Sequence, residues 1–179
     1  MMEPRTATTA IVLHCTAGPD RPTLDWPGVC RYHTNPPPAG RGYHAPGYHF
    51  GVELADGDIL VLPGRAPHLE GAHCRAHSAN RYSLGVAVVG DFDFDPPAPA
   101  LLRATSAVLA NLALAYAIPV DSILGHRELE PQKTCPGARW PLETTRAMVA
   151  AILHEQHQLN GTDTAGPHWF GRHIRLGEL

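Results

Sequence analysis

The stretch that organises the chain reads Gly125-His126-Arg127-Glu128-Leu129-Glu130-Pro131-Gln132-Lys133-Thr134-Cys135-Pro136-Gly137. It places a histidine and a cysteine nine positions apart, with a lysine two residues before the cysteine, in a segment interrupted by prolines and bounded by glycines. Zinc prefers imidazole and thiolate ligands, and a catalytic zinc takes three protein ligands and leaves a fourth position open. His126 and Cys135 are therefore predicted to supply two of three zinc ligands.

The third ligand is predicted far upstream, at His14. The apolar residues 10–13 indicate a buried strand that ends in a turn, which puts His14 at the carboxyl end of the strand, where active sites gather in α/β sheets. Because side chains alternate along a strand, Cys15 is expected to face the other way and pack in the core. A lone histidine here would as readily be a core residue, and it is the pair His126 and Cys135 that favours a ligand.

A rival metal cluster lies in Gly71-Ala72-His73-Cys74-Arg75-Ala76-His77, where two histidines and a cysteine fall within five positions. Spacing alone makes this cluster a competitor for zinc. The remaining histidines of the first half, His44, His49 and His68, are expected to have packing or surface roles.

Five short motifs follow one another along the chain. They are His-Cys-Thr-Ala at 14–17, Gly-Tyr-His-Phe at 47–50, Gly-Ala-His at 71–73, Val-Gly-Asp-Phe at 89–92, and Gly-His-Arg with Lys-Thr-Cys-Pro at 125–136. Together they resemble the zinc-dependent N-acetylmuramoyl-L-alanine amidases, a family that includes amidase-type bacteriophage lysozymes and peptidoglycan recognition proteins. The resemblance implies an α/β fold, a single domain with a mixed central β-sheet flanked by helices.

The resemblance also implies roles for single residues. Zn²⁺ would be held by His14, His126 and Cys135, while Tyr48 and Lys133 match positions that the related phage lysozymes need for catalysis. His73 matches a residue that faces the substrate, and Asn80, in a segment longer than the family's, is a further candidate for substrate binding. Related recycling amidases have Asp at the third ligand position, so Cys135 favours the lysozyme-like branch.

The function that this resemblance implies is hydrolysis of the amide bond between N-acetylmuramic acid and L-alanine in bacterial peptidoglycan, as a phage-type endolysin. The alternative is a non-catalytic module that binds peptidoglycan, as family members lacking the cysteine ligand do. Cys135, Tyr48 and Lys133 together favour the enzyme. A regulatory partner role has no feature in this sequence to support it.

Length and composition favour one domain. With 179 residues and 44% hydrophobic residues, the chain can bury a sizeable core but has little room for a second domain. We expect the zinc amidase domain to occupy residues 1–159, followed by a tail at 160–179, and we expect a monomer. A net charge of -3 and a pI near 6.4 exclude the basic surface typical of nucleic-acid binding.

No membrane insertion is expected. Residues 1–6 lack the pattern of a secretory signal, and the longest apolar stretch, 108–120, is too short to span a bilayer. Of the four cysteines one is claimed by the metal, and the others lack the spacing of a disulfide scaffold. We therefore expect synthesis in the cytoplasm, without a signal peptide, and action on the cell wall after release.

The remaining patterns predict the elements around the site. Asp25 is expected to cap a helix at 24–33, and the Pro-rich segment 36–46 is expected to form one wall of the cleft. The pattern also predicts a hairpin of strands 48–54 and 58–62 and a central strand 83–89. A helix is predicted at 97–116 and a last helix at 142–157, and the segment 120–124 is expected to lead directly into the metal loop.

Overall fold

The computed structural model describes residues 3–17 and 24–162, with side chains as far as residue 159. Its strands are β1 (Ala10–Cys15), β2 (Phe50–Ala55), β3 (Asp58–Pro63), β4 (Ser83–Val88) and β5 (Ile123–Gly125). Its helices are α1 (Trp26–Thr34), α2 (Pro99–Tyr116), α3 (His126–Leu129) and α4 (Leu142–Thr162), with 3-10 turns η1 (Ala76–Arg81) and η2 (Val120–Ser122). The predicted tail lies, from residue 163 on, outside the described residues.

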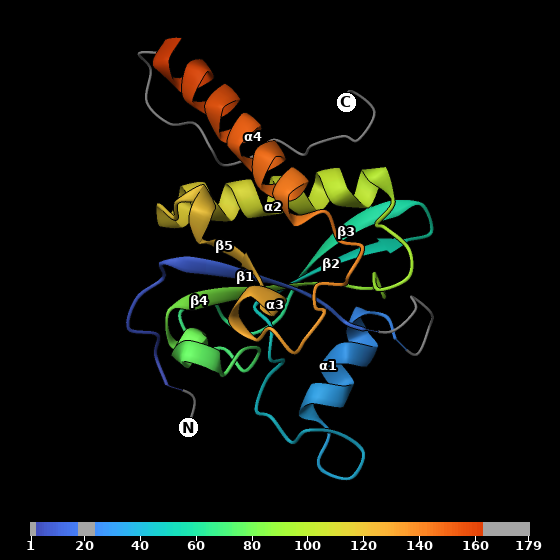
Figure 1. Cartoon of the computed structure of the whole chain (residues 1–179). Coiled ribbons are helices and arrows are strands. Elements are labelled where there is room, and N and C mark those ends of the chain that lie inside the picture. Colours follow the sequence, from blue (N-terminus) through green and yellow to red (C-terminus); the bar gives the residue numbers. More distant parts are fainter. Residues whose placement is uncertain (1–2, 18–23, 163–179) are drawn as a thin grey trace.

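The five strands form one mixed sheet in the order β3-β2-β4-β1-β5 (Figure 1). β1 pairs in parallel with β4 and β5, β2 pairs in parallel with β4, and β2 and β3 form an antiparallel hairpin. Asp56 and Gly57 turn the hairpin with φ values of 52° and 89°, the left-handed backbone that two-residue hairpin turns require. The predicted α/β class, the mixed sheet and the central place of β4 are confirmed.

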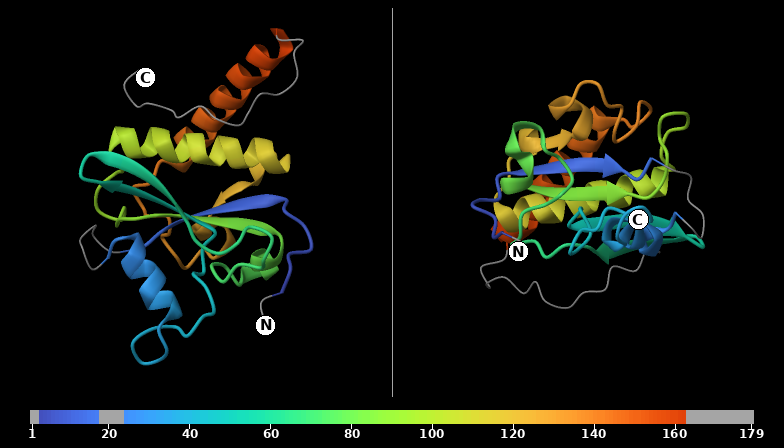
Figure 2. Two further views of the ribbon diagram at one scale, coloured as in Figure 1. Left: turned by 180° about the vertical axis from the view of Figure 1, so that it is seen from behind. Right: turned by 90° about the horizontal axis from the view of Figure 1, so that it is seen from below.

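Helices cover both faces of this sheet, as the views of Figures 1 and 2 agree. On one face Ile11, Leu13 and Cys15 of β1 join a core completed by α2 and α4. On the other face α1 inserts Trp26 against Ala87 and Val89. Because successive side chains point to opposite faces, His14 lies on the α1 side, and the expected core position of Cys15 is confirmed.

The helix ends follow local chemistry. The Asp25 side chain accepts a 2.7 Å hydrogen bond from the Gly28 backbone N–H, so the predicted cap of α1 is confirmed. α2 has the length and hydropathy of a membrane span, but Leu109 and Ala113 on its inner face lie in the core. α4 continues past the boundary predicted at residue 159.

The metal loop begins with a short helix. Its first residues form the single turn α3, which no pattern in the sequence predicted. The Glu128 carboxylate accepts the Gly125 backbone N–H at 2.8 Å, and Glu130 N–H donates to the His126 carbonyl at 2.9 Å. These two bonds satisfy groups at both ends of a very short helix.

Candidate metal centre

Three residues far apart in the sequence meet at the carboxyl ends of β1 and β5. One ligand atom each of His14, His126 and Cys135 lies within 4.8 Å of the other two. The Sγ atom of Cys135 is 3.6 Å from Nδ1 of His14, and the rings of His14 and His126 are 4.5 Å apart. The structure therefore brings together the three residues that the sequence predicted as ligands.

Strand pairing puts the two histidines side by side. In the parallel ladder Leu13 of β1 is opposite Gly125 of β5, so the next residue on each chain, His14 and His126, lies at the same edge. A Cβ on Gly125 would come within 2.9 Å of the end of the Leu142 side chain, so this edge packs closely against α4. The strand pairing thus positions two of the predicted ligands without the help of a bound metal.

The loop that carries Cys135 is held from two sides. The Arg127 backbone N–H donates to the Cys135 carbonyl at 2.7 Å, and its guanidinium donates to the carbonyls of Gly137 and Trp140. From the other side, the Asp93 carboxylate accepts hydrogen bonds from the Thr134 hydroxyl at 2.9 Å and from a loop backbone N–H at 2.8 Å. These contacts position the thiol independently of any bound ion.

Each histidine has its outer nitrogen occupied by a further side chain. Nε2 of His14 is 3.1 Å from Nδ1 of His73, and Nε2 of His126 is 3.1 Å from the Glu130 carboxylate. A Cβ on Gly85 would come within 2.5 Å of the His73 ring, so β4 makes room for that ring. Metal-binding histidines use their second nitrogen in this way, which fixes ring orientation and tautomer.

Burial and neighbouring groups set the protonation states of the three predicted ligands. Burial, with smaller effects of His73 and His126, holds the pKa of His14 well below its usual value. Burial also lowers the pKa of His126, against the opposing effect of Glu130. Both imidazoles are neutral at neutral pH, the form that binds metal. A hydrogen bond with the Cys15 thiol and burial raise the pKa of Cys135, so its thiolate needs a cation nearby to form.

The two residues predicted to act in catalysis flank this centre. The Tyr48 ring is 5.1 Å from the His14 ring, and burial raises the pKa of its phenol, which stays protonated. Lys133 is 46% exposed, with Nζ 3.7 Å from the second oxygen of Glu130. Glu130 thus contacts a predicted ligand and the predicted catalytic lysine at once.

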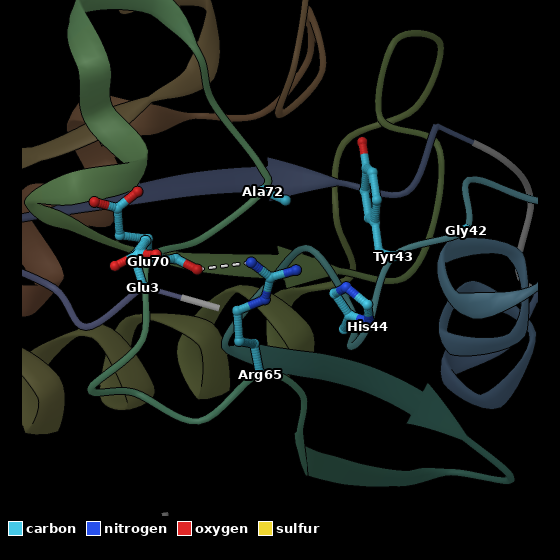
Figure 3. Close-up of a pocket in the computed structure, with 7 residues that line it drawn as sticks. All are labelled: Glu3, Gly42, Tyr43, His44, Arg65, Glu70 and Ala72. Carbon is cyan, nitrogen blue, oxygen red and sulfur yellow. Dashed lines mark hydrogen bonds between the residues drawn. The ribbon is translucent and has the colours of Figure 1, made fainter. Parts of the chain in front are cut away.

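An aromatic row leads from the centre to a pocket of about 300 Å³. The row continues from Tyr48 to His33 at 5.3 Å and to Tyr43 at 5.8 Å between ring centres. The pocket is lined by Glu3, Gly42, Tyr43, His44, Arg65, Glu70 and Ala72, and Figure 3 shows the Arg65 guanidinium reaching toward Glu70. Three of these residues come from 36–46, so the Pro-rich segment lines this pocket, while its place as a wall of the substrate cleft stays a prediction.

The residues predicted to bind substrate make internal contacts. The Asn80 side-chain oxygen accepts the backbone N–H groups of His73 and Cys74, each at 2.9 Å, and so shapes the turn that presents His73 to His14. Contact of His73 or Asn80 with a substrate stays a prediction. His49 is buried as expected, with Nδ1 accepting the Gly85 N–H at 2.8 Å.

The rival cluster does not form. His77 is exposed, and among the described residues the ligand groups that approach one another closely are His14 with His126 and Cys135, and Cys74 with His126 and Glu130. Glu130 was not predicted from the sequence, although its place four residues after His126 puts it on the same side of a helical turn. Arg127 and Asp93 were not predicted either, and no local pattern gives a signal for them.

Comparison with known proteins agrees with this geometry. The family model described as N-acetylmuramoyl-L-alanine amidase matches residues 4–138. An N-acetylmuramoyl-L-alanine amidase of Sus scrofa is 32% identical over 71% of this chain, which spans only 21% of that protein's length. The endolysin of Enterobacteria phage T3 is 29% identical over 77% of this chain and 88% of its own length.

The likeness extends to solved structures. The amidase LysC from Clostridium intestinale superposes with a TM-score of 0.69 and 23% identity, covering 84% of this chain and 90% of its own. At this identity the superposition shows a shared fold, and the family match covers well over half of the chain. By sequence match and by fold, this chain belongs to the N-acetylmuramoyl-L-alanine amidase family.

Proposed function

We propose that the chain is a zinc-dependent N-acetylmuramoyl-L-alanine amidase, which hydrolyses the amide bond between N-acetylmuramic acid and L-alanine in bacterial peptidoglycan. The observation that carries this proposal is the convergence of His14, His126 and Cys135 within 4.8 Å at one edge of the sheet. Family membership supports the bond and the substrate class.

The donor set fits zinc. Two neutral imidazoles and one thiol that ionises only beside a cation form a three-ligand set, which leaves a coordination position for the reaction. Zinc bound there would act as a Lewis acid toward the scissile carbonyl and would activate a water at neutral pH. The contacts of His73 and Glu130 on the outer nitrogens support the same assignment, since they involve Nε2 and not Nδ1 of each histidine.

The chain's own residues would then handle charge and protons. Tyr48 keeps its phenol hydrogen because of its burial, so we assign it a hydrogen bond to the oxyanion that develops on the substrate carbonyl. Lys133, held by Glu130 near the ligands, adds positive charge to the same region and can deliver a proton to the departing amine. Such groups act strongly because they are oriented before the reaction begins.

We further propose the role of a phage-type endolysin, which would act on the cell wall after release from the cytoplasm. The similarity to the phage T3 endolysin supports this role, because it extends over 88% of that protein. Cys135, which stands where the related recycling amidases have Asp, also supports this role.

The test is digestion of purified peptidoglycan by zinc-loaded protein beside a chelated sample, with the products identified by mass. We expect free stem peptides whose N-terminus is L-alanine, their loss on chelation and their return with added zinc. Tight binding to the same peptidoglycan without any cleavage would instead identify a recognition module. Cleavage within the glycan or within the stem peptide would refute the assigned bond.

A further inference from the structure

A second group of metal-ligand side chains lies against the outer edge of His126. Cys74 Sγ is 4.0 Å from Oε1 of Glu130, and the same oxygen is 3.1 Å from Nε2 of His126. One ligand atom of each of these three residues lies within 4.8 Å of the other two. The group therefore adjoins the proposed zinc centre but faces the opposite nitrogen of the shared histidine.

The elements that carry this group are held firmly in place. The Cys74 backbone N–H is fixed by Asn80 at 2.9 Å, and its side chain is 1% exposed. Glu130 ends the short helix α3 and is 19% exposed, so the position opens to solvent on the Glu130 side. The carboxylate of Glu130 is thus the solvent-facing side of the group, and the thiol of Cys74 is its buried side.

The chemistry of the group selects a soft or borderline divalent cation. A thiolate ligand favours zinc and cadmium, whereas magnesium and calcium require oxygen ligands. A zinc on Nδ1 of His126 leaves a hydrogen on its Nε2, so a second ion depends on Cys74 and Glu130, with water completing its coordination. Such a position is weaker than the three-ligand centre.

We propose that Cys74 and Glu130, at the edge of His126, form a second and weaker site for zinc or cadmium, and that its occupation inhibits the enzyme. Binding would displace the Cys74 thiol proton to solvent and take up the carboxylate that now contacts His126 and Lys133. Lys133 and the outer nitrogen of His126 would then lose their common partner. Excess zinc would slow turnover while the first zinc remained in place.

The experiment titrates the zinc-free full chain with cadmium and follows the sulfur-to-cadmium charge-transfer absorption, with bound metal counted after desalting. For the wild type we expect a tight first equivalent and a weaker second one, each adding a thiolate signal. Cys74→Ser should keep the first equivalent and lose the second, whereas Cys135→Ser should show the reverse. Cys30→Ser, which changes a partly buried thiol on α1, is the matched control and should bind like the wild type.

Activity on peptidoglycan gives the functional arm, which rests on the proposed function. Rising zinc should inhibit the wild type and Cys30→Ser but not Cys74→Ser, with equal activity at one equivalent. A wild type that binds a single equivalent, or a Cys74→Ser protein that still binds two, would overturn the second site. Since metal counting needs no turnover, a protein that can bind two equivalents but is inactive with one equivalent would count against the amidase proposal alone.

Thermal unfolding of the zinc-free variants checks that each is folded. If Cys74→Ser were unfolded, Glu130→Gln would replace it in the cadmium titration only, because it removes the charge of the second ligand while Cys74 stays intact. Retention of the weak equivalent in a folded Glu130→Gln protein would also contradict the proposal.

Discussion

Glu130 offers the sharpest test of how the centre is built. Its carboxylate lies 3.1 Å from Nε2 of His126 and 3.7 Å from Nζ of Lys133, and the hydrogen bond with His126 holds the pKa of Glu130 below its usual range. It is therefore charged at neutral pH. A carboxylate in this place makes the histidine a better donor to metal and fixes its ring.

Replacing such a partner lowers metal affinity by about 10- to 100-fold, or about 1.4 to 2.7 kcal/mol. Glu130→Gln keeps an oxygen acceptor for His126 and loses only the charge, so we expect about a 10-fold weaker zinc affinity. Glu130→Ala removes the acceptor as well, and about a 100-fold loss is expected. The assay is competition for zinc against a chromophoric chelator, at metal concentrations low enough to fill only the tight centre.

Glu128→Gln is the control on the same helical turn. Its carboxylate binds the Gly125 backbone and Arg146 but neither predicted ligand histidine. We expect lower stability with unchanged zinc affinity. Equal zinc affinity in the wild type and in both Glu130 variants would show that the Glu130 contact does not support the metal centre.

Three further predictions concern catalysis, acid stability and helix capping. Tyr48→Phe should bind zinc normally and lose about 100- to 1,000-fold in kcat, the cost of one missing oxyanion donor. Single-turnover kinetics with a count of bound zinc would check this, and an unchanged kcat would exclude Tyr48 as an oxyanion donor. Burial lowers the pKa of His49 to about 4, below about 6.5 in an unfolded chain, so the unfolded state takes up the proton first. Stability that is present above pH 6.5 is therefore lost as the pH falls toward 4, by about 2 kcal/mol at pH 5. His49→Asn retains an acceptor for the Gly85 N–H. Between pH 7.5 and pH 5 its free energy of unfolding in urea should fall by about 2 kcal/mol less than that of the wild type. An identical fall in both proteins would show that His49 is not the source of the acid sensitivity. Finally, Asp25→Ala removes the cap of α1 and should cost about 1 kcal/mol, with Asp25→Asn nearly neutral, both measured by urea unfolding.

The sequence alone determined the parts of this protein that depend on local pattern. The alternation in β1 predicted that His14 and Cys15 face opposite sides of the sheet, and the structure confirms Cys15 in the core. Asp25 predicted the start of helix α1, because an N-cap acts within a few residues. The three proposed ligands could be named because zinc restricts the possible side chains and because their motifs resemble, in order, those of a known family.

Tertiary structure alone decided what surrounds those ligands. Glu130 contacts both Cys74 and His126, and no local pattern connects residue 74 with residue 130. Asp93 accepts hydrogen bonds from the loop that carries Cys135, and this contact also joins residues far apart in the sequence. The rival cluster failed because η1 leaves His77 exposed while Cys74 is buried. Ligand identity follows from residue chemistry, but the partners that orient each ligand depend on how distant segments pack, which only the folded chain reveals.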